Sequence, residues 1–214
     1  MTDRYDISNS SESLWQPGSN EKVLLNRLAI VNTEDMENLE FDLLLRLQNQ
    51  LLNEIEIDSR IQSDDLCQWH QRWLGEVYEW AGRYRSVNLS IGDFQFAAAY
   101  RIHDLMAQFD RDIIGSYTPC GSFSDAELID AISITHVELI VIHPFRDGNG
   151  RLARLLATVM ALQANKPLLN FEMMASDKKR YIGAIHAGHD RNYEPMRQIF
   201  GEILEYSLAE NRDF

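Results

Sequence analysis

The chain has 214 residues, 45% of them hydrophobic, which is enough to bury the core of one domain. Its formal net charge of −13 argues against general nucleic-acid binding, which requires a basic surface. No apolar run reaches the roughly 20 residues of a membrane span, and the polar N-terminus lacks the apolar core of a signal peptide. The two isolated cysteines, Cys67 and Cys120, suit a reducing cytosol.

The first third of the chain predicts a loose arm followed by helices. Residues 1–22 are rich in Ser and Asn, and contain Pro17-Gly18. We expect a short helix over 24–30, a helix capped by Asn32 or Thr33 and ending near Glu56, and a third helix over 64–80. Apolar residues recur along the third helix at spacings of four, four and three: Trp69, Trp73, Val77 and Trp80. Such a stripe is more often part of a core than a ligand platform.

Residues 85–97 alternate between apolar and polar side chains, which predicts a β-hairpin that turns at Gly92-Asp93. Ser124 and Glu127 form a capping box at the start of a long apolar helix. The remaining helical segments are expected at about 102–116, 124–142, 150–164, 177–188 and 193–210. The pattern is that of a mostly helical bundle with one small hairpin.

The most informative stretch is His143-Pro-Phe-Arg-Asp-Gly-Asn-Gly-Arg151, followed one turn later by Arg154. Pro144 ends the preceding helix, and Asn149 is a good N-cap for the next one. Gly148 and Gly150 can adopt backbone angles closed to other residues, so that backbone N–H groups converge on an anion at a helix start. Arg151 and Arg154 would lie on one helical face and donate to phosphate oxygens.

Two further residues complete a candidate site. A neutral His143 can take a proton from an attacking hydroxyl, and Asp147 is a natural Mg²⁺ ligand beside phosphates. Phe145 is expected to point away, as an apolar anchor in the core. Structural interpretations exist for each residue: His143 could pack, Asp147 could cap a turn, Gly-Asn-Gly could be a plain turn, and Arg154 could form a surface ion pair. The local chemistry favours a nucleotide phosphate, a metal ion and a general base.

These residues match the signature of the Fic (filamentation-induced-by-cAMP) family, H-x-F-x-D/E-G-N-G-R-x-x-R, at every defined position. The segment from Trp69 to Arg85 resembles the helix that precedes the family's flap, and the segment Ser90–Phe96 resembles the flap. The resemblance covers roughly residues 20–205. It implies an N-terminal arm over 1–22, a mostly helical Fic domain over 23–205 with a β-hairpin flap beside the active-site loop, and a C-terminal tail over 206–214.

The resemblance implies a protein adenylyltransferase, which transfers AMP from ATP to a Ser, Thr or Tyr hydroxyl of a target protein and releases pyrophosphate. Carried over by the motif, His143 is the catalytic base and Asp147 holds Mg²⁺. The implied phosphate-binding residues are Gly148, Asn149, Gly150, Arg151 and Arg154. Because the body of the protein is acidic, Arg146, Arg151 and Arg154 would form a local positive island for ATP. The enzyme would act in a bacterial-type cytoplasm, or in a host cell after secretion.

The remaining contacts follow from the same resemblance. The flap, including Ile91, Gly92, Asp93 and Phe94, is expected to touch the nucleotide and to align the target segment as an added strand. Arg180 and Tyr181 fall where family members contact adenine or ribose. Gly188 stands where several relatives carry Asn, which leaves the identity of the base open.

Three routes to inhibition stay open. Many Fic proteins carry an S/T-x-x-x-E-G/N helix whose Glu pairs with the second motif arginine, here Arg154. Thr33-Glu-Asp-Met-Glu37-Asn38 matches this pattern, although acidic residues also suit a helix start. Tyr206-Ser-Leu-Ala-Glu210-Asn211 matches it except at Tyr206. In the third route a separate small antitoxin protein supplies the glutamate.

Two alternative functions stay open as well. One is a different reaction at the same site: transfer of UMP, phosphocholine or phosphate, or removal of AMP. The other is a catalytically inactive nucleotide-binding regulatory module.

Overall fold

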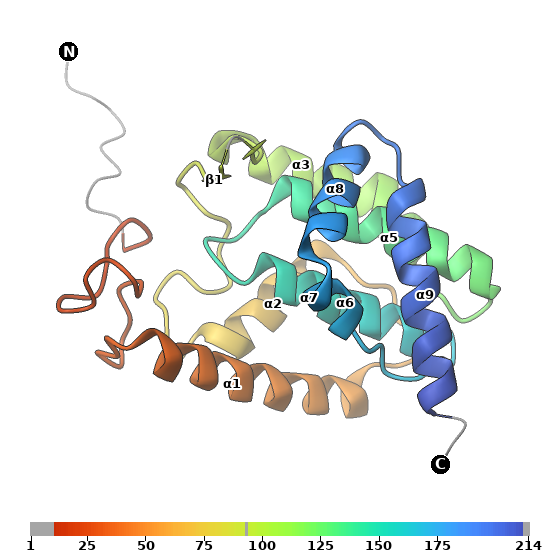
Figure 1. The fold of residues 1–214 in the computed structure, drawn as a ribbon, viewed down its shortest axis with the longest axis horizontal. Helices are drawn as coiled ribbons and strands as arrows, with labels where there is room; N and C mark the ends of the chain where they lie inside the picture. The colour runs from red at the N-terminus through yellow and green to blue at the C-terminus, as the bar shows by residue number, and fades with distance from the viewer. Residues whose placement is uncertain (1–10, 93, 212–214) are drawn as a thin grey trace.

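The computed structural model describes residues 11–92 and 94–211, and this part of the chain is helical with one small hairpin (Figure 1). A 3₁₀ turn, η2, and a π-helical turn, η3, interrupt the α-helices. In chain order the elements are α1 (Thr33–Glu54), α2 (Ser63–Leu74), β1 (Ser90–Ile91), β2 (Phe94–Gln95), η2 (Ala99–Arg101), α3 (Ile102–Gln108), η3 (Phe109–Ile114), α4 (Gly115–Tyr117), α5 (Asp125–Ile142), α6 (Asn149–Gln163), α7 (Glu172–Ser176), α8 (Lys178–His189) and α9 (Glu194–Glu210).

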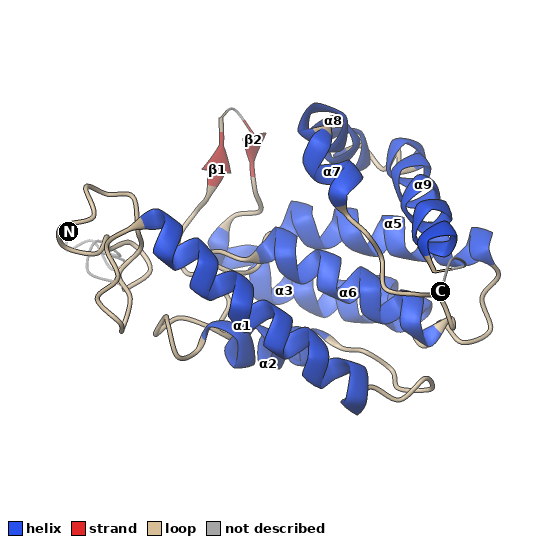
Figure 2. Ribbon diagram, turned by 60° about the horizontal axis from the view of Figure 1, so that its bottom comes forward, coloured by secondary structure: helices blue, strands red, loops and turns tan. Residues whose placement is uncertain are grey.

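Helix α5 is the centre of the fold. The predicted capping box begins it: Ser124 accepts from the Glu127 backbone N–H, and the Glu127 carboxylate accepts from the Ser124 N–H at 2.8 Å. Most of its side chains are buried, and it packs against α6, α8 and α9. Figure 2 shows α1 and α2 on one side of α5 and α6, and α8 and α9 on the other. Nearly all the buried hydrophobic residues form one contiguous cluster, so the described chain is organised around a single core.

The hairpin stands close to α8. Its strands pair antiparallel, with Ser90 opposite Gln95 and Ile91 opposite Phe94. Phe94 stacks on His186 of α8, with ring centroids 4.9 Å apart. The hairpin and α8 therefore rise side by side from the same side of the molecule (Figure 2).

The hairpin is much shorter than residues 85–97, the range that the alternation predicted. The buried side chain of Arg85 explains the difference, because its guanidinium donates to the carbonyls of Val87 and Ala97, one on each arm. Ala97 also donates its N–H to Val141 at the end of α5. The backbone groups near the base of the hairpin are thus bound to Arg85 and α5, and strand pairing is confined to the tip.

The short helix predicted over 24–30 is absent from the structure. Asn26 accounts for this, since its side chain donates to the carbonyls of Leu24 and Ile30 and accepts from the N–H groups of Leu28 and Ile30. A side chain that binds neighbouring backbone groups in this way competes with the helical pattern. The helix predicted over 64–80 is also too long, because α2 ends before Gly75. Trp69, Trp73, Val77 and Trp80 are nevertheless all buried, as the core interpretation predicted.

Other boundaries differ less. The helix predicted over 102–116 is divided by the π-helical turn η3, and α7 was not predicted at all. Helix α9 matches the helix predicted over 193–210, and it includes the first residues of the predicted C-terminal tail. Among the residues before 23, Glu12 accepts from Ser86, and a backbone bridge joins Trp15 to Leu24. Within the described residues, no helix combines the length and the apolarity needed to cross a membrane.

Candidate active site

The loop from His143 to Gly148 connects α5 to α6 and has left-handed backbone at both ends. His143 ends α5 at φ 53°, and Gly148 precedes α6 at φ 79°. A Cβ atom on Gly148 would lie 2.7 Å from the Trp73 ring, so this position requires glycine for both conformation and space. Gly150 differs from our expectation: it lies in the first turn of α6 and has no positive φ.

The floor of the loop is held by buried rings. Phe145 is fully buried, as predicted, and stacks on His70 at a centroid distance of 4.1 Å. His70 Nδ1 accepts from the Gly82 N–H at 2.8 Å, so the proton is on Nε2, which donates to the Asp147 carbonyl at 3.1 Å. Burial lowers the pKa of His70 to about 4 and keeps it neutral. This histidine therefore fixes the backbone at Asp147.

Asn149 has a different position from the one predicted. Gly148 is the N-cap of α6, and Asn149 is its first helical residue. The buried Asn149 side chain accepts from the Phe145 N–H at 2.9 Å and donates to the Phe145 carbonyl at 2.8 Å. Both ends of its amide are thus engaged inside the loop. Its side chain shapes the turn, and the first backbone N–H groups of α6 have no acceptor within the helix.

His143 is a neutral imidazole with a defined tautomer. Its Nδ1 lies 3.2 Å from the Ile140 carbonyl, which can only accept, so Nδ1 carries the proton. No hydrogen bond within the described part of the chain engages Nε2, which keeps its lone pair. Phe96 of the hairpin stacks on the ring at a centroid distance of 3.7 Å. Burial lowers the pKa of His143 to about 4, with the Arg85 charge acting in the same direction and Asp147 opposing it.

Arg151 contacts two carboxylates, that of Asp147 in the loop and that of Glu40 on α1. Asp147 Oδ1 accepts from the Gly148 N–H at 2.6 Å, and Oδ2 lies 3.5 Å from the Arg151 guanidinium. Arg151 also pairs with Glu40 of α1 at 2.5 Å and lies over the Trp73 ring at 4.7 Å. The Asp147 side chain remains 47% exposed. Arg151 is therefore already partly neutralised, whereas Asp147 has an accessible carboxylate.

Arg154 is the second motif arginine, and its charge has no carboxylate partner among the ion pairs of the described residues. Burial lowers its pKa from the usual arginine value, and the nearby Tyr181 opposes this shift. Arg146, the third member of the expected positive island, donates to the Glu12 carbonyl at 2.6 Å and does not line the cavity. The arginines of the motif thus have three different environments.

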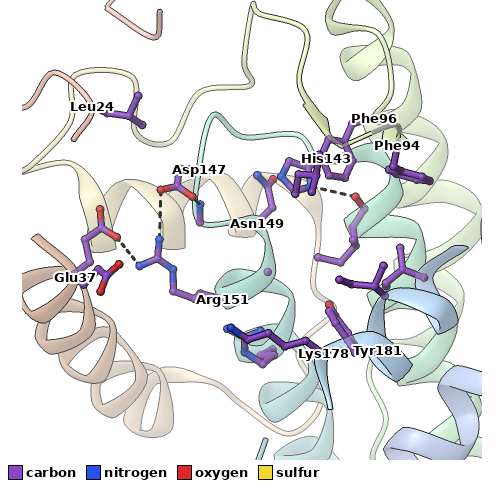
Figure 3. Close-up of a pocket in the computed structure, with 18 of the residues that line it drawn as sticks. Leu24, Glu37, Phe94, Phe96, His143, Asp147, Asn149, Arg151, Lys178 and Tyr181 are labelled. Carbon is purple, nitrogen blue, oxygen red and sulfur yellow. Dashed lines mark hydrogen bonds and ion pairs between the residues drawn. The ribbon is translucent and has the colours of Figure 1, made fainter. Parts of the chain in front are cut away.

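These residues meet in a cavity of about 1040 Å³ (Figure 3). The motif contributes His143, Asp147, Gly148, Asn149, Gly150, Arg151 and Arg154. Figure 3 shows Phe96 against His143 on one side of the cavity and Glu37 on the side of Arg151. One cavity therefore brings together His143, the Asp147 carboxylate, the start of α6 and both motif arginines.

Only some of the residues predicted to contact the nucleotide line the cavity. Ile91, Phe94 and Tyr181 line the cavity, whereas Gly92 does not, and Asp93 lies outside the described residues. Arg180 points elsewhere, because it pairs with Glu202 of α9 at 2.6 Å. Lys178, two residues earlier on the same helix, lines the cavity instead. A helix presents one face to the cavity, and the face of α8 that does so carries Lys178, Tyr181, Ile182, Ile185 and His186.

Gly188 allows α8 to pack closely against α5. A Cβ atom there would lie 2.3 Å from Val137 of α5, so a side chain at this position would meet α5. Gly188 therefore gives no information about the base of the nucleotide.

The two candidate inhibitory glutamates lie in different places. Glu37 lines the cavity. Glu210 accepts from Asn170 at 3.1 Å and is not among the lining residues. No ion pair within the described residues joins either one to Arg154.

Comparison with known proteins identifies the family of this chain. Residues 60–161 match the model of the Fic/DOC family. The chain is 33% identical to the "Protein adenylyltransferase Fic" of Nematostella vectensis over 181 residues, 82% of this chain and 39% of that protein. It is 28% identical to the "Protein adenylyltransferase fic-1" of Caenorhabditis elegans over 82% of this chain and 33% of that protein. The chain thus spans between a third and two fifths of the length of these relatives.

A solved structure has the same fold. The Bartonella tribocorum BepC protein, described as a VirB-translocated effector with bound AMPPNP, superimposes with a TM-score of 0.67 over 85% of this chain and 92% of that one, at 19% identity. The helical fold, the loop and the family match define the class of protein. The chain belongs to the Fic/DOC family, and its relatives include protein adenylyltransferases.

Sequence reasoning missed several residues that build the site. Glu40, His70, Arg85 and Phe96 were not singled out, although each contacts the loop or a motif side chain. They come from segments that the fold brings to the loop. The only signal in the sequence was a charged or polar residue at an otherwise apolar helix position, as with Glu40 and His70.

Proposed function

We propose that the protein transfers AMP from ATP to a Ser, Thr or Tyr hydroxyl of a target protein and releases pyrophosphate. The observation that carries this proposal is the state of His143. Its Nδ1 proton is held by Ile140, and its Nε2 has no hydrogen-bond partner among the described residues, in the cavity that also contains Asp147 and Arg154. A neutral imidazole beside a phosphate-binding turn is suited to activate a hydroxyl. The names of the relatives, and the AMPPNP bound to BepC, support the choice of ATP.

The phosphate side of the cavity is built from backbone and arginine. The first hydrogen bond within α6 runs from Leu152 to Gly148, so the N–H groups of Asn149, Gly150 and Arg151 have no acceptor in the helix. A helix start of this kind binds anions. Arg154 adds a guanidinium that pairs with no carboxylate of residues 11–92 and 94–211, and Lys178 lines the same cavity. We assign the triphosphate of ATP to this end.

The residues present also fit a magnesium ion. Mg²⁺ in nucleotide sites is commonly held by one or two carboxylates, with phosphates and water as its other ligands. Asp147 offers one half-exposed carboxylate beside the α6 N-terminus. No cluster of three metal-binding side chains occurs in the described chain, so a closed protein cage is not what this site provides. Asp147 would hold the ion, which would neutralise charge on the phosphates.

The reaction then needs little covalent chemistry from the protein. His143 Nε2 accepts the proton of the target hydroxyl as the hydroxyl oxygen bonds to the α-phosphorus of ATP. The bond from that phosphorus to the bridging oxygen breaks, and pyrophosphate leaves with that oxygen. The α6 amides and Arg154 stabilise the charge on the phosphates during transfer. The product is a phosphodiester between AMP and the target side chain.

The hairpin is the proposed docking edge for the target. Ile91 on β1 is 67% exposed and also lines the cavity. An extended segment that pairs with this edge would place a hydroxyl near His143.

The proposed regulatory partner is a small antitoxin, which would inhibit the enzyme by supplying a glutamate. A reducing cytosol suits the two cysteines, which form no disulfide with each other.

The test is transfer of label from ATP that carries its radiolabel on the α-phosphate. Wild-type protein and His143→Ala are incubated with Mg²⁺, alone and in a lysate. We expect labelled protein only with the wild type, while calorimetry shows that both bind the non-hydrolysable analogue AMPPNP. Equal labelling by both variants would overturn the role of His143. Binding without labelling, in parallel runs with labelled CTP, GTP and UTP as well, would favour the inactive nucleotide-binding module.

A further inference from the structure

The imidazole of His143 is in contact with the hairpin as well as with its own loop. Phe96 follows β2 and stacks on the imidazole, with ring centroids 3.7 Å apart and an interplanar angle of 22°. Figure 3 shows the two rings against one another at the edge of the cavity. This contact covers one face of the imidazole with an apolar ring. The other fixed point on the ring is Nδ1, which donates to Ile140.

A buried charge joins the same two segments behind the ring. The Arg85 guanidinium donates to the His143 carbonyl at 2.7 Å, and it also donates to Val87 and Ala97 on the two arms of the hairpin. Arg85 is only 2% exposed. Because one planar group binds all three carbonyls, the arms of the hairpin are fixed relative to the left-handed backbone of His143.

The outer part of the hairpin is also held in place. Phe94 packs edge-to-face on Phe96 at 5.4 Å and stacks on His186 of α8 at 4.9 Å. A row of rings thus runs from His143 through Phe96 and Phe94 to α8. Only the Phe96 contact in this row covers the proposed base.

We propose that Phe96 is a positioning residue for His143. Through this ring, the hairpin fixes the plane of the His143 imidazole and shields one face of the imidazole from water. The inference rests on the proposed function and extends the role of the hairpin beyond docking the target. It assigns to Phe96 no contact with the reacting atoms. Fixing a base to within an ångström matters because a misplacement of that size can lower a rate by about 10²-fold.

The charged surroundings agree with a base that is kept neutral. Arg85, from the segment before the hairpin, disfavours the protonated form, and Asp147, from the loop, favours it. Arg154 of α6 and Lys178 and His186 of α8 line the same cavity. Burial is nevertheless the largest influence and lowers the pKa of His143 to about 4. Removing the ring that covers the imidazole should therefore raise this pKa toward its usual value.

The proposal is tested by NMR titration of the histidine rings in Phe96→Ala, with His143 assigned by comparison with His143→Gln. In the wild type we expect the His143 ring to stay neutral, with the proton on Nδ1, from pH 5 to pH 8. In Phe96→Ala we expect the titration midpoint of His143 to rise into the range of pH 5 to pH 8. We also expect the imidazole to populate both neutral tautomers. Under the proposed activity, kcat should fall by about 10- to 100-fold while AMPPNP affinity changes less than twofold.

Two further variants keep the test decisive. Phe94→Ala removes a ring of the same size from the same hairpin, but that ring does not stack on His143, so the titration of His143 should stay as in the wild type. Phe96→Leu keeps apolar bulk without a flat ring, should shift the midpoint less than Phe96→Ala, and serves if the alanine variant does not fold. An unchanged His143 midpoint and tautomer in folded Phe96 variants would overturn the proposal. Because the titration needs no substrate, it gives this answer even if AMP transfer is never detected.

Discussion

Glu40 and Arg151 form an ion pair that connects α1 to the first turn of α6, with 2.5 Å between Oε2 and Nη1. The Glu40 side chain is 5% exposed, and its other oxygen accepts from the Tyr78 hydroxyl at 2.7 Å. A motif residue expected to bind phosphate is therefore also the partner of a buried carboxylate. Arg154, three residues later, has no such partner in the described ion pairs.

The two arginines should consequently respond differently to the same substitution. Arg151→Ala leaves the Glu40 carboxylate buried without its cation, so we expect the free energy of unfolding to fall by about 3 kcal/mol. Arg154→Ala should lower it much less, yet weaken AMPPNP binding. Urea unfolding and calorimetry on both variants measure this contrast. Equal destabilisation by the two would show that the Glu40 pair contributes little.

Gly148 and Gly150 form a second matched pair. Gly148→Ala combines a φ of 79° with a Cβ atom 2.7 Å from Trp73, and we expect a loss of roughly 2 to 4 kcal/mol in stability. At Gly150 the nearest atom to an added Cβ is Arg154 Nη1 at 3.8 Å, so Gly150→Ala should stay within about 1 kcal/mol of the wild type. Thermal unfolding compares them, and a Gly150→Ala variant as unstable as Gly148→Ala would contradict this account.

Stability should fall in mild acid. Burial lowers the pKa of His70 and His143 to about 4 and that of His136 to about 3. Between these values and the usual 6.5 the unfolded chain binds protons that the folded chain does not, so stability rises with pH there and is lost as pH falls toward 4. Each histidine contributes up to about 1.4 kcal/mol per pH unit. Urea midpoints at pH 7 and pH 5 test the sign, and His70→Gln should make the slope shallower.

The position of Glu37 predicts an electrostatic effect. It adds a negative charge to the cavity that we assign to the triphosphate. Glu37→Gln should tighten ATP binding by about threefold, because a like charge is removed from a partly solvated site. Glu34→Gln, on the same helix but outside the cavity, and Glu210→Gln should leave the Kd unchanged. A similar gain in all three variants would point to net charge alone. No gain in any of them would favour a separate inhibitory protein.

Local sequence patterns predicted the parts of the site that lie close together in the chain. The capping box at Ser124, the end of α5 before Pro144 and the motif from His143 to Arg154 all depend on neighbours within one or two turns. The hydrogen-bond partners of the Asn149 side chain could not be predicted in the same way. An amide can cap a helix, bind a phosphate or donate to a loop carbonyl equally well.

The errors and omissions have a common physical origin in contacts between distant segments. Arg85 acts on His143 from 58 residues away, and Glu40 acts on Arg151 from 111. The apolar periodicity also led us to predict a helix that continues to Trp80, although α2 ends at Leu74. The buried turn after α2 continues the apolar spacing without being helical. On α8 the spacing did not reveal that Lys178, rather than Arg180, shares the cavity face with Tyr181.

The small size of the hairpin has a kinetic consequence for the proposed docking of a target segment. Its paired strands are only two residues long, so a segment added to this edge gains few main-chain hydrogen bonds. Few bonds imply fast dissociation, since differences in affinity between related complexes reside mostly in the off-rate. A target held by this edge alone would have a short residence time. A modified protein could then leave soon after transfer, and selectivity would depend on whether the hydroxyl reaches His143 during a brief encounter.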